Sequence, residues 1–222
     1  MSVLDISLEG TVRVNYSISE TCSNDTSGES RLLSSPFVFS QFWNRFVAVG
    51  CNTFASLNSL EDHSVIGGCM SVCEKTPKLT NGTSCSGINC CQTTIPSNLD
   101  VFLTTIKPIG TESQRTVDCK YAFIVEQKWL ECNFIDPIEV RNVSMVPVVL
   151  EGGINRTDFS LITGRNMSSY NSSRSQTYLC GNSPTSTGKL SSTFTCFCRS
   201  GFEGNPYLPQ TQGCTGKLLA VY

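Results

Sequence analysis

The stretch CMSVCEKTPKLTNGTSCSGINCC, residues 69–91, holds five cysteines in 23 positions and decides how this part of the chain folds. The spacing is Cys69-x3-Cys73 followed by Cys85-x4-Cys90-Cys91. Too few consecutive apolar residues are present for burial to hold the segment. Cross-links must therefore hold it, and each contributes about 2–4 kcal/mol by restricting the unfolded chain. Cys90 and Cys91 are expected to bond to different partners, because a ring between adjacent residues is strained.

Cysteines are frequent along the whole chain, which has 13 of them among 222 residues. Seven N-x-[ST] sequons accompany them and are predicted glycosylation sites; they begin at Asn15, Asn24, Asn81, Asn142, Asn155, Asn166 and Asn171. Together these features predict folding outside the reducing cytosol. The alternative is a cytosolic protein whose thiols stay reduced. Because 13 is an odd number, at least one thiol must lack a partner within the chain.

Apolar periodicity predicts strands along much of the sequence. At the N-terminus, Leu4, Ile6 and Leu8 alternate with polar residues, which indicates a hairpin with one buried face and a turn near residues 9–10. The run 37–39 and the run 46–49 are apolar at successive positions, as in strands covered on both faces.

Later segments are read in the same way. Residues 121–125 are β-like, and the apolar run 146–150 contains Pro147, which favours an edge strand. Residues 107–114 indicate a linker, residues 164–195 indicate a solvated loop, and no segment shows sustained helical periodicity. The sequence thus predicts a mainly β protein, built of small disulfide-rich extracellular modules with long irregular loops.

Charge and motif content exclude several function classes. The formal net charge is −2 and the 16 Lys and Arg are dispersed, so no nucleic-acid partner is expected. Phosphate-binding and kinase motifs are absent from the sequence. The single histidine, His63, lies in a polar segment and is expected at the surface rather than in a Cys–His catalytic pair. Paired carboxylates of a hydrolase carry no sequence signature, so that enzyme class stays open.

Two further kinds of site compete with purely structural interpretations. Cys69, Cys73, Cys85 and Cys90 could supply four thiolates to a zinc ion, although disulfides are favoured in an oxidising compartment. Trp43 and Trp129 could stack on sugar rings, although packing in the core is the favoured role for each.

The termini suggest part of a longer precursor. The residues near Met1 do not form the apolar core of an export signal, and no stretch approaches the ~20 apolar residues of a membrane helix.

Several longer motifs occur in a fixed order: SQFWNRFVAVGC at 40–51, GCMSVC at 68–73, CSGINCCQT at 85–93, YAF at 121–123, VPVVL at 146–150 and CFCRSGFEGNPYL at 196–208. This set resembles the extracellular region of plant wall-associated receptor kinases. The resemblance implies a partial galacturonan-binding module at 1–110, the family's following region at 111–178, a degenerate EGF-like segment at 179–214 and a divergent tail at 215–222.

The resemblance implies an apoplastic region that binds pectin and its oligogalacturonides. It also implies a Ser/Thr kinase domain and one membrane helix in the parent protein, outside this chain, so the chain itself is expected to be no enzyme and to need no cofactor. The alternatives are a module that binds a protein partner such as a co-receptor, and a truncated gene product without function.

The chain departs from the family pattern in several places. The N-terminal Cys-Gly segment is missing, Glu151-Gly152 replaces an expected Trp, and an acidic calcium-binding consensus is lacking. By analogy with EGF-like segments, Cys180 pairs with Cys196, whereas Cys198 and Cys214 lack partners. The remaining disulfide candidates are then Cys22, Cys51, Cys69, Cys73, Cys85, Cys90, Cys91, Cys119 and Cys132.

Pectin binding itself makes a chemical demand. Polygalacturonate carries one carboxylate on each sugar, so a protein that binds it should present Arg or Lys, or share calcium with the polymer. Arg13, Arg31 and Arg45 are the candidate cations, and Trp43 is a candidate for stacking.

Overall fold

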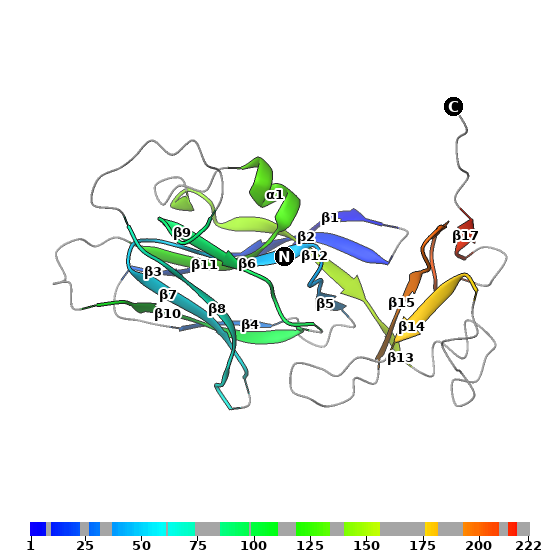
Figure 1. Cartoon of the computed structure of the whole chain (residues 1–222), viewed down its shortest axis with the longest axis horizontal. Coiled ribbons are helices and arrows are strands. Elements are labelled where there is room, and N and C mark those ends of the chain that lie inside the picture. Colours follow the sequence, from blue (N-terminus) through cyan, green and yellow to red (C-terminus); the bar gives the residue numbers. More distant parts are fainter. Residues whose placement is uncertain are drawn as a thin grey trace.

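The structure is a computed structural model that describes residues 1–7, 10–22, 27–31, 37–60, 62–73, 85–97, 99–110, 119–133, 140–155, 176–181, 193–208 and 213–216. Three four-stranded antiparallel sheets form a β-sandwich, and two smaller sheets form a C-terminal module beside it (Figure 1). The predicted mainly β, disulfide-rich fold is confirmed.

The first sheet has the strand order β1-β2-β12-β5. Its strands are β1 (Ser2–Ile6), β2 (Thr11–Ser17), β12 (Met145–Gly152) and β5 (Phe37–Phe39). β12 therefore lies between two strands that precede it by more than 100 residues in the chain.

The other two sheets complete the sandwich. The sheet β3-β11-β6-β9 consists of β3 (Ser19–Thr21), β11 (Lys120–Glu126), β6 (Asn44–Val49) and β9 (Cys90–Thr93). The sheet β4-β10-β7-β8 consists of β4 (Ser27–Arg31), β10 (Val101–Pro108), β7 (Thr53–Asn58) and β8 (Val65–Ser71).

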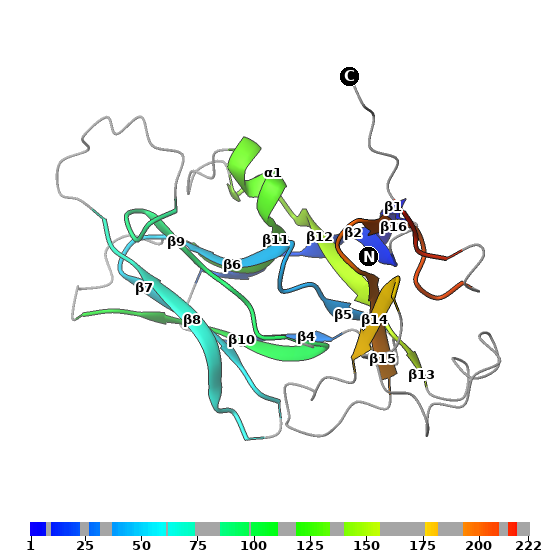
Figure 2. The same cartoon turned by 45° about the vertical axis from the view of Figure 1, so that its right-hand side comes forward.

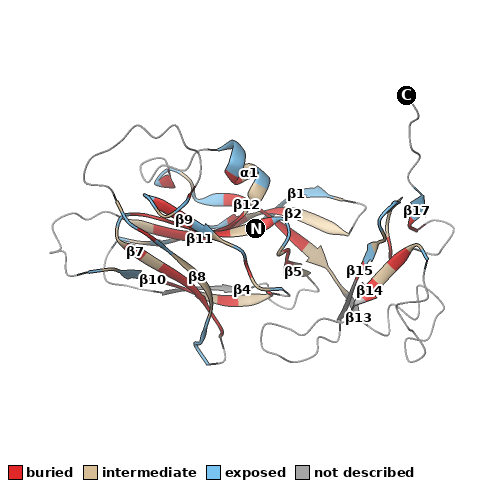
Figure 3. Cartoon of the chain, viewed as in Figure 1, coloured by how far each residue is buried: buried red, intermediate tan, exposed pale blue. Residues whose placement is uncertain are grey.

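The sheet that contains β6 and β11 is covered on both faces (Figure 3). On β6, Phe46 and Ala48 pack into one core, with residues from the other two sheets, whereas Val47 and Val49 pack into a second core. The short helix α1 (Gln127–Cys132) contributes Leu130 to that second core, on the side away from β7 and β10 (Figure 1). The prediction that the run 46–49 is covered on both faces is confirmed, because side chains alternate along a strand.

The C-terminal module is much thinner (Figure 2). It comprises β13 (Ile154–Asn155), β14 (Tyr178–Gly181), β15 (Thr193–Cys198), β16 (Phe202–Glu203) and β17 (Thr215–Gly216). The prediction of a loop over residues 164–195 is wrong where β14 and the start of β15 lie, because these two strands pair with each other. The rest of that segment lies outside the described residues.

Six disulfides cross-link the chain, and their positions explain the predicted dependence on sulfur. They join Cys22 to Cys119, Cys51 to Cys73, Cys69 to Cys91, Cys85 to Cys90, Cys180 to Cys196 and Cys198 to Cys214. Cys90 and Cys91 bond to different partners, as predicted. The Cys180–Cys196 pair that the resemblance implied is present.

Two expectations about cysteines are corrected. Cys198 and Cys214 do not lack partners, because they bond to each other across the end of the C-terminal module. The free thiol is instead Cys132, which is exposed at the end of α1 and had been counted among the disulfide candidates. The zinc alternative also fails, because the four proposed thiolates belong to three different disulfides.

The N-terminal hairpin is present, but its predicted buried face is only partly right. β1 and β2 pair antiparallel, and Val14 and Tyr16 of β2 are buried. Leu4 and Ile6 are exposed, as is every residue of β1, the edge strand of this sheet, and Leu8 lies outside the described residues.

The edge position predicted for the strand that contains Pro147 is wrong. β12 pairs with β2 along most of its length, whereas β5 pairs only with residues 150–152 on the other side. Val149 directs its N–H away from β2, to Asn44 Oδ1 at 2.9 Å. Since N–H directions alternate along a strand, the nitrogen of Pro147 points to that same side, before the pairing with β5 begins.

The segment read as a linker starts later than the sequence suggested. Lys107 and Pro108 still belong to β10 and pair with β7, and the N–H of Ile109 donates to Asn52 O at 2.8 Å. Residues 111–118 lie outside the described part of the chain. The helix α1, which shows no sequence periodicity over its six residues, was not predicted.

Candidate functional site

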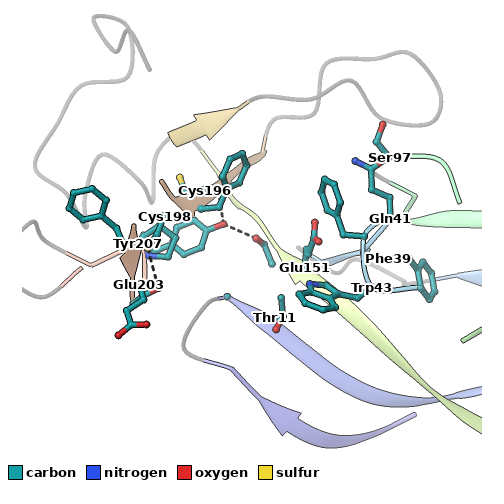
Figure 4. A pocket seen from close by; sticks show the side chains of 17 residues that line it. Thr11, Phe39, Gln41, Trp43, Ser97, Glu151, Cys196, Cys198, Glu203 and Tyr207 are labelled. Carbon is teal, nitrogen blue, oxygen red and sulfur yellow. Dashed lines mark hydrogen bonds between the residues drawn. The ribbon is translucent and has the colours of Figure 1, made fainter. Parts of the chain in front are cut away.

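A cleft of about 690 Å³ lies between the β-sandwich and the C-terminal module (Figure 4). Its sandwich side comes from the β1–β2 turn, the turn at residues 40–43 and the end of β12. Its other side comes from β15, β16 and the segment that follows. A volume of this size is typical of sites for a small molecule or a few peptide side chains.

The turn at residues 40–43 is fixed to β12 by the buried side chain of Asn44. Its Nδ2 donates to Ser40 O at 2.8 Å and to Val149 O at 2.7 Å, while its Oδ1 accepts from the N–H of Val149. The amide therefore forms three hydrogen bonds to the backbone and ties the turn to β12. This anchoring leaves the next turn residues, Phe42 and Trp43, with 69% and 54% exposure.

Tyr207 fastens the C-terminal module to the sandwich. Its hydroxyl donates to Gly152 O at 2.8 Å and accepts from the N–H of Cys196 at 3.0 Å. Its ring lies against Gly10, where φ is +87° and an added Cβ would come within 3.2 Å of the ring. Burial raises the pKa of the Tyr207 phenol, and the nearby charge of Glu151 adds to the rise.

The charge of the cleft is negative. Glu151 lies on the sandwich side, near Trp43, and Glu203 lies on the module side, beyond Tyr207 (Figure 4). The Glu151 carboxylate accepts a hydrogen bond from the Ser40 hydroxyl. Lys, Arg and His are absent from the described residues that line the cleft. The arrangement therefore favours neutral or positively charged ligands over anions.

Of the three candidate arginines, the structure describes the side chains of Arg13 and Arg45 and does not bring these two together. Arg13 Nη2 lies 2.7 Å from the Glu126 carboxylate, which already neutralises its charge. Arg45 lies opposite Val125 in the β6–β11 ladder, whereas Glu126 lies opposite Asn44. Because neighbouring side chains alternate, Arg45 and Glu126 point to opposite faces of that sheet. The side chain of Arg31 lies outside the described residues.

The two tryptophans have different environments. Trp129 is partly buried and packs against the second core, in line with the favoured role. Trp43 does not pack in the core as favoured, because the turn anchored by Asn44 directs it into the cleft. The other favoured assignment, His63 at the surface, is confirmed by its exposed position between β7 and β8.

The described sequons occupy different settings. Asn142 is exposed in a turn, and Asn15 is partly exposed on β2. Asn155 lies on β13, and glycosylation at all seven sequons stays a prediction. Asn24, Asn81, Asn166 and Asn171 lie outside the described residues.

Metal binding finds little support among the described residues. A single group there brings three His, Cys, Asp or Glu ligand atoms together, namely Glu20, Cys22 and Cys119. Its two sulfurs are joined in a disulfide and so are not thiolates.

Sequence reasoning missed two residues that shape the cleft. Glu151 was noted only as a departure from a family motif, and Tyr207 only as part of the run Gly-Asn-Pro-Tyr. Their contacts come from residues far away in the chain, so no local signal reveals them.

Comparison with known proteins agrees with the motif order. Residues 82–161 match the family described as "Wall-associated kinase". The chain resembles the extracellular region of wall-associated receptor kinases. Wall-associated receptor kinase 2 of Arabidopsis thaliana is 31% identical over 96% of this chain, and wall-associated receptor kinase 5 of the same plant is 33% identical over 77%.

The match covers a limited part of these relatives. The chain spans 28% of wall-associated receptor kinase 2 and 22% of wall-associated receptor kinase 5. It resembles the non-catalytic extracellular region, and no kinase domain is indicated. No solved structure matches the chain. Among the described residues, no helix has the length and apolar character needed to cross a bilayer.

Proposed function

We propose that this chain is the wall-facing part of a wall-associated receptor kinase and that it binds acidic galacturonan, the backbone of pectin, on the extracellular side of the plasma membrane. The observation that carries the proposal is the match to wall-associated receptor kinases along 96% of the chain. In this proposal the kinase domain and the membrane helix belong to the parent protein, outside this chain.

Arg45 is the described candidate best suited to a galacturonate carboxylate. Its Nη1 donates to Asn44 O at 2.8 Å, which orients the guanidinium but does not neutralise it. Arg13, by contrast, already faces Glu126. A partly exposed Arg–carboxylate contact is worth at most about 1 kcal/mol, so affinity must come from several such contacts along the polymer.

The proposal is tested by titrating the oxidised chain with de-esterified oligogalacturonides at low and at high salt. We expect binding at low salt that weakens as salt rises, because exposed charges are screened within about 10 Å at 0.1 M. Fully methyl-esterified oligogalacturonides, which lack the charge, should bind much less.

A matched pair of variants locates the contact. Arg45→Gln is expected to weaken binding about threefold to fivefold, whereas Arg13→Gln should have a smaller effect because its charge is already paired. Binding of esterified and de-esterified oligomers with equal affinity, or binding indifferent to salt, would contradict the proposal.

A further inference from the structure

The cleft between the sandwich and the C-terminal module is lined by aromatic side chains and carboxylates, without a described cation, and a surface that binds anionic pectin does not need this combination. We infer that it is a separate docking site for a positively charged segment of a peptide or protein, which inserts an Arg or Lys side chain between Trp43 and Glu151, while Glu203 adds negative charge on the far side of Tyr207.

Exposed aromatic side chains form the apolar part of this site. Phe42 and Trp43 project from the turn at residues 40–43, and Phe197 projects from β15 with 55% exposure. These rings come from two parts of the molecule, and both parts are held in place. The turn is fixed by Asn44 and by the N–H of Gln127, which donates to Trp43 O at 2.7 Å. Ring faces that are exposed yet held in place can accept cations from solution.

The carboxylates supply the complementary charge. Among the described residues, neither Glu151 nor Glu203 forms an ion pair with Lys or Arg, in contrast to Glu126, which pairs with Arg13. Glu151 is oriented by the Ser40 hydroxyl, and Glu203 is exposed on the opposite side. A guanidinium or ammonium group that stacks on Trp43 would therefore lie next to Glu151, whereas Glu203 lies farther away, beyond Tyr207 (Figure 4).

The same charges disfavour the polymer. A galacturonate chain placed here would bring its own carboxylates next to Glu151 and Glu203, without a described cation in the lining. Like charges in contact are unfavourable, so the cleft discriminates between the two classes of ligand. Its volume of about 690 Å³ suits one or two inserted side chains of an extended segment rather than a folded domain.

The test uses the oxidised full chain and a fluorescent, end-capped octapeptide of alternating arginine and glycine, followed by fluorescence anisotropy. We expect binding at low salt that weakens as salt rises. The isosteric peptide with citrulline in place of arginine should bind at least about tenfold more weakly, because it retains the shape but lacks the charge.

Variants distinguish binding in the cleft from nonspecific electrostatic attraction to the rest of the protein surface. The double variant Glu151→Gln/Glu203→Gln and the single variant Trp43→Ala should each weaken the arginine peptide about threefold to tenfold. As matched controls, Asp62→Asn between β7 and β8 removes an exposed charge outside the cleft, and Met70→Ala on β8 removes an exposed apolar side chain outside it. Both controls should leave binding unchanged.

Three outcomes would overturn the inference. One is the absence of arginine-peptide binding at low salt. Another is equal weakening by the cleft variants and by the controls. The third is loss of oligogalacturonide binding in Trp43→Ala, which would assign the cleft to the polymer instead. Glu203→Gln alone, at an exposed position, provides a folded variant if the double variant is unstable.

Discussion

The β-sandwich and the C-terminal module use the same kind of cross-link around very different amounts of buried hydrocarbon. The described part of the sandwich has two cores, of 16 and 10 buried residues. The described core of the C-terminal module has four, and three of these are cysteines. In the sandwich, disulfides reinforce a structure that burial already specifies. In the module they take the place of the core, as in small disulfide-rich domains.

The largest expected effect lies in the core of the sandwich. Phe39 is fully buried and packs edge-on with Tyr16 and Phe102, at ring-centroid distances of 5.1 and 5.5 Å. Phe39→Ala should lower the free energy of unfolding by about 3–5 kcal/mol, measured by urea denaturation, because it leaves a cavity. The exposed neighbour Phe42 provides the control, since Phe42→Ala should change stability by less than about 0.5 kcal/mol.

Removal of one disulfide from the module should have a smaller and more local effect. The double variant Cys198→Ala/Cys214→Ala should destabilise the module by about 3 kcal/mol. Amide hydrogen exchange should then increase in β15 and β16 and stay slow in β6 and β11. Cys132→Ala, which removes the free exposed thiol, serves as the control and should change neither region. Equal loss of protection in the sandwich would show that the two regions are not independent.

The smallest expected effect lies at the contact between the two regions. Tyr207→Phe removes the hydrogen bonds to Gly152 O and from the Cys196 N–H, at a cost of about 0.5–1.5 kcal/mol. Faster amide exchange confined to the module would show this loss. An unchanged exchange pattern would mean that Tyr207 does not fasten the module.

The same variant has a distinctive dependence on pH. Burial raises the folded-state pKa of Tyr207 above its ordinary value of 10.0, so the fold favours the neutral phenol. The resulting stabilisation is complete below pH 10 and is lost as pH rises through the folded-state pKa. Tyr207→Phe should therefore lose less stability than the parent above pH 10. The comparison is best made in a Cys132→Ala background, because a free thiolate exchanges disulfides at alkaline pH.

Much of the strand content could be predicted from local sequence. The run 46–49 is apolar at each position, and both faces of β6 are indeed buried. The order of the strands could not be predicted in the same way. The position of β12 between β2 and β5 depends on contacts between segments that are far apart in the chain. Pro147 suggested an edge strand, but its nitrogen faces the β5 side of β12 at a point where β5 does not pair, so the proline interrupts no ladder.

Most of the cleft could not be predicted from the sequence. Trp43 was considered, but its exposure results from Asn44, whose amide bonds β12 about 100 residues later. The Cys198–Cys214 disulfide was not predicted, because the analogy with EGF-like segments left both cysteines without a partner. Pairing depends instead on which cysteines lie close together in space. Local patterns thus predict elements, and long-range contacts determine which surfaces those elements leave open.

The late position of β12 in the chain affects how the protein is made. β2 ends at Ser17 and β12 begins at Met145, so the edge of β2 that pairs with β12 stays unpaired until the ribosome has added about 130 more residues, which takes roughly 6–25 s. Cys22 is separated from its partner Cys119 by 97 residues, while Cys51 emerges much sooner. A bridge between Cys22 and Cys51 is therefore the first non-native disulfide that becomes available as the chain is synthesised from its N-terminus.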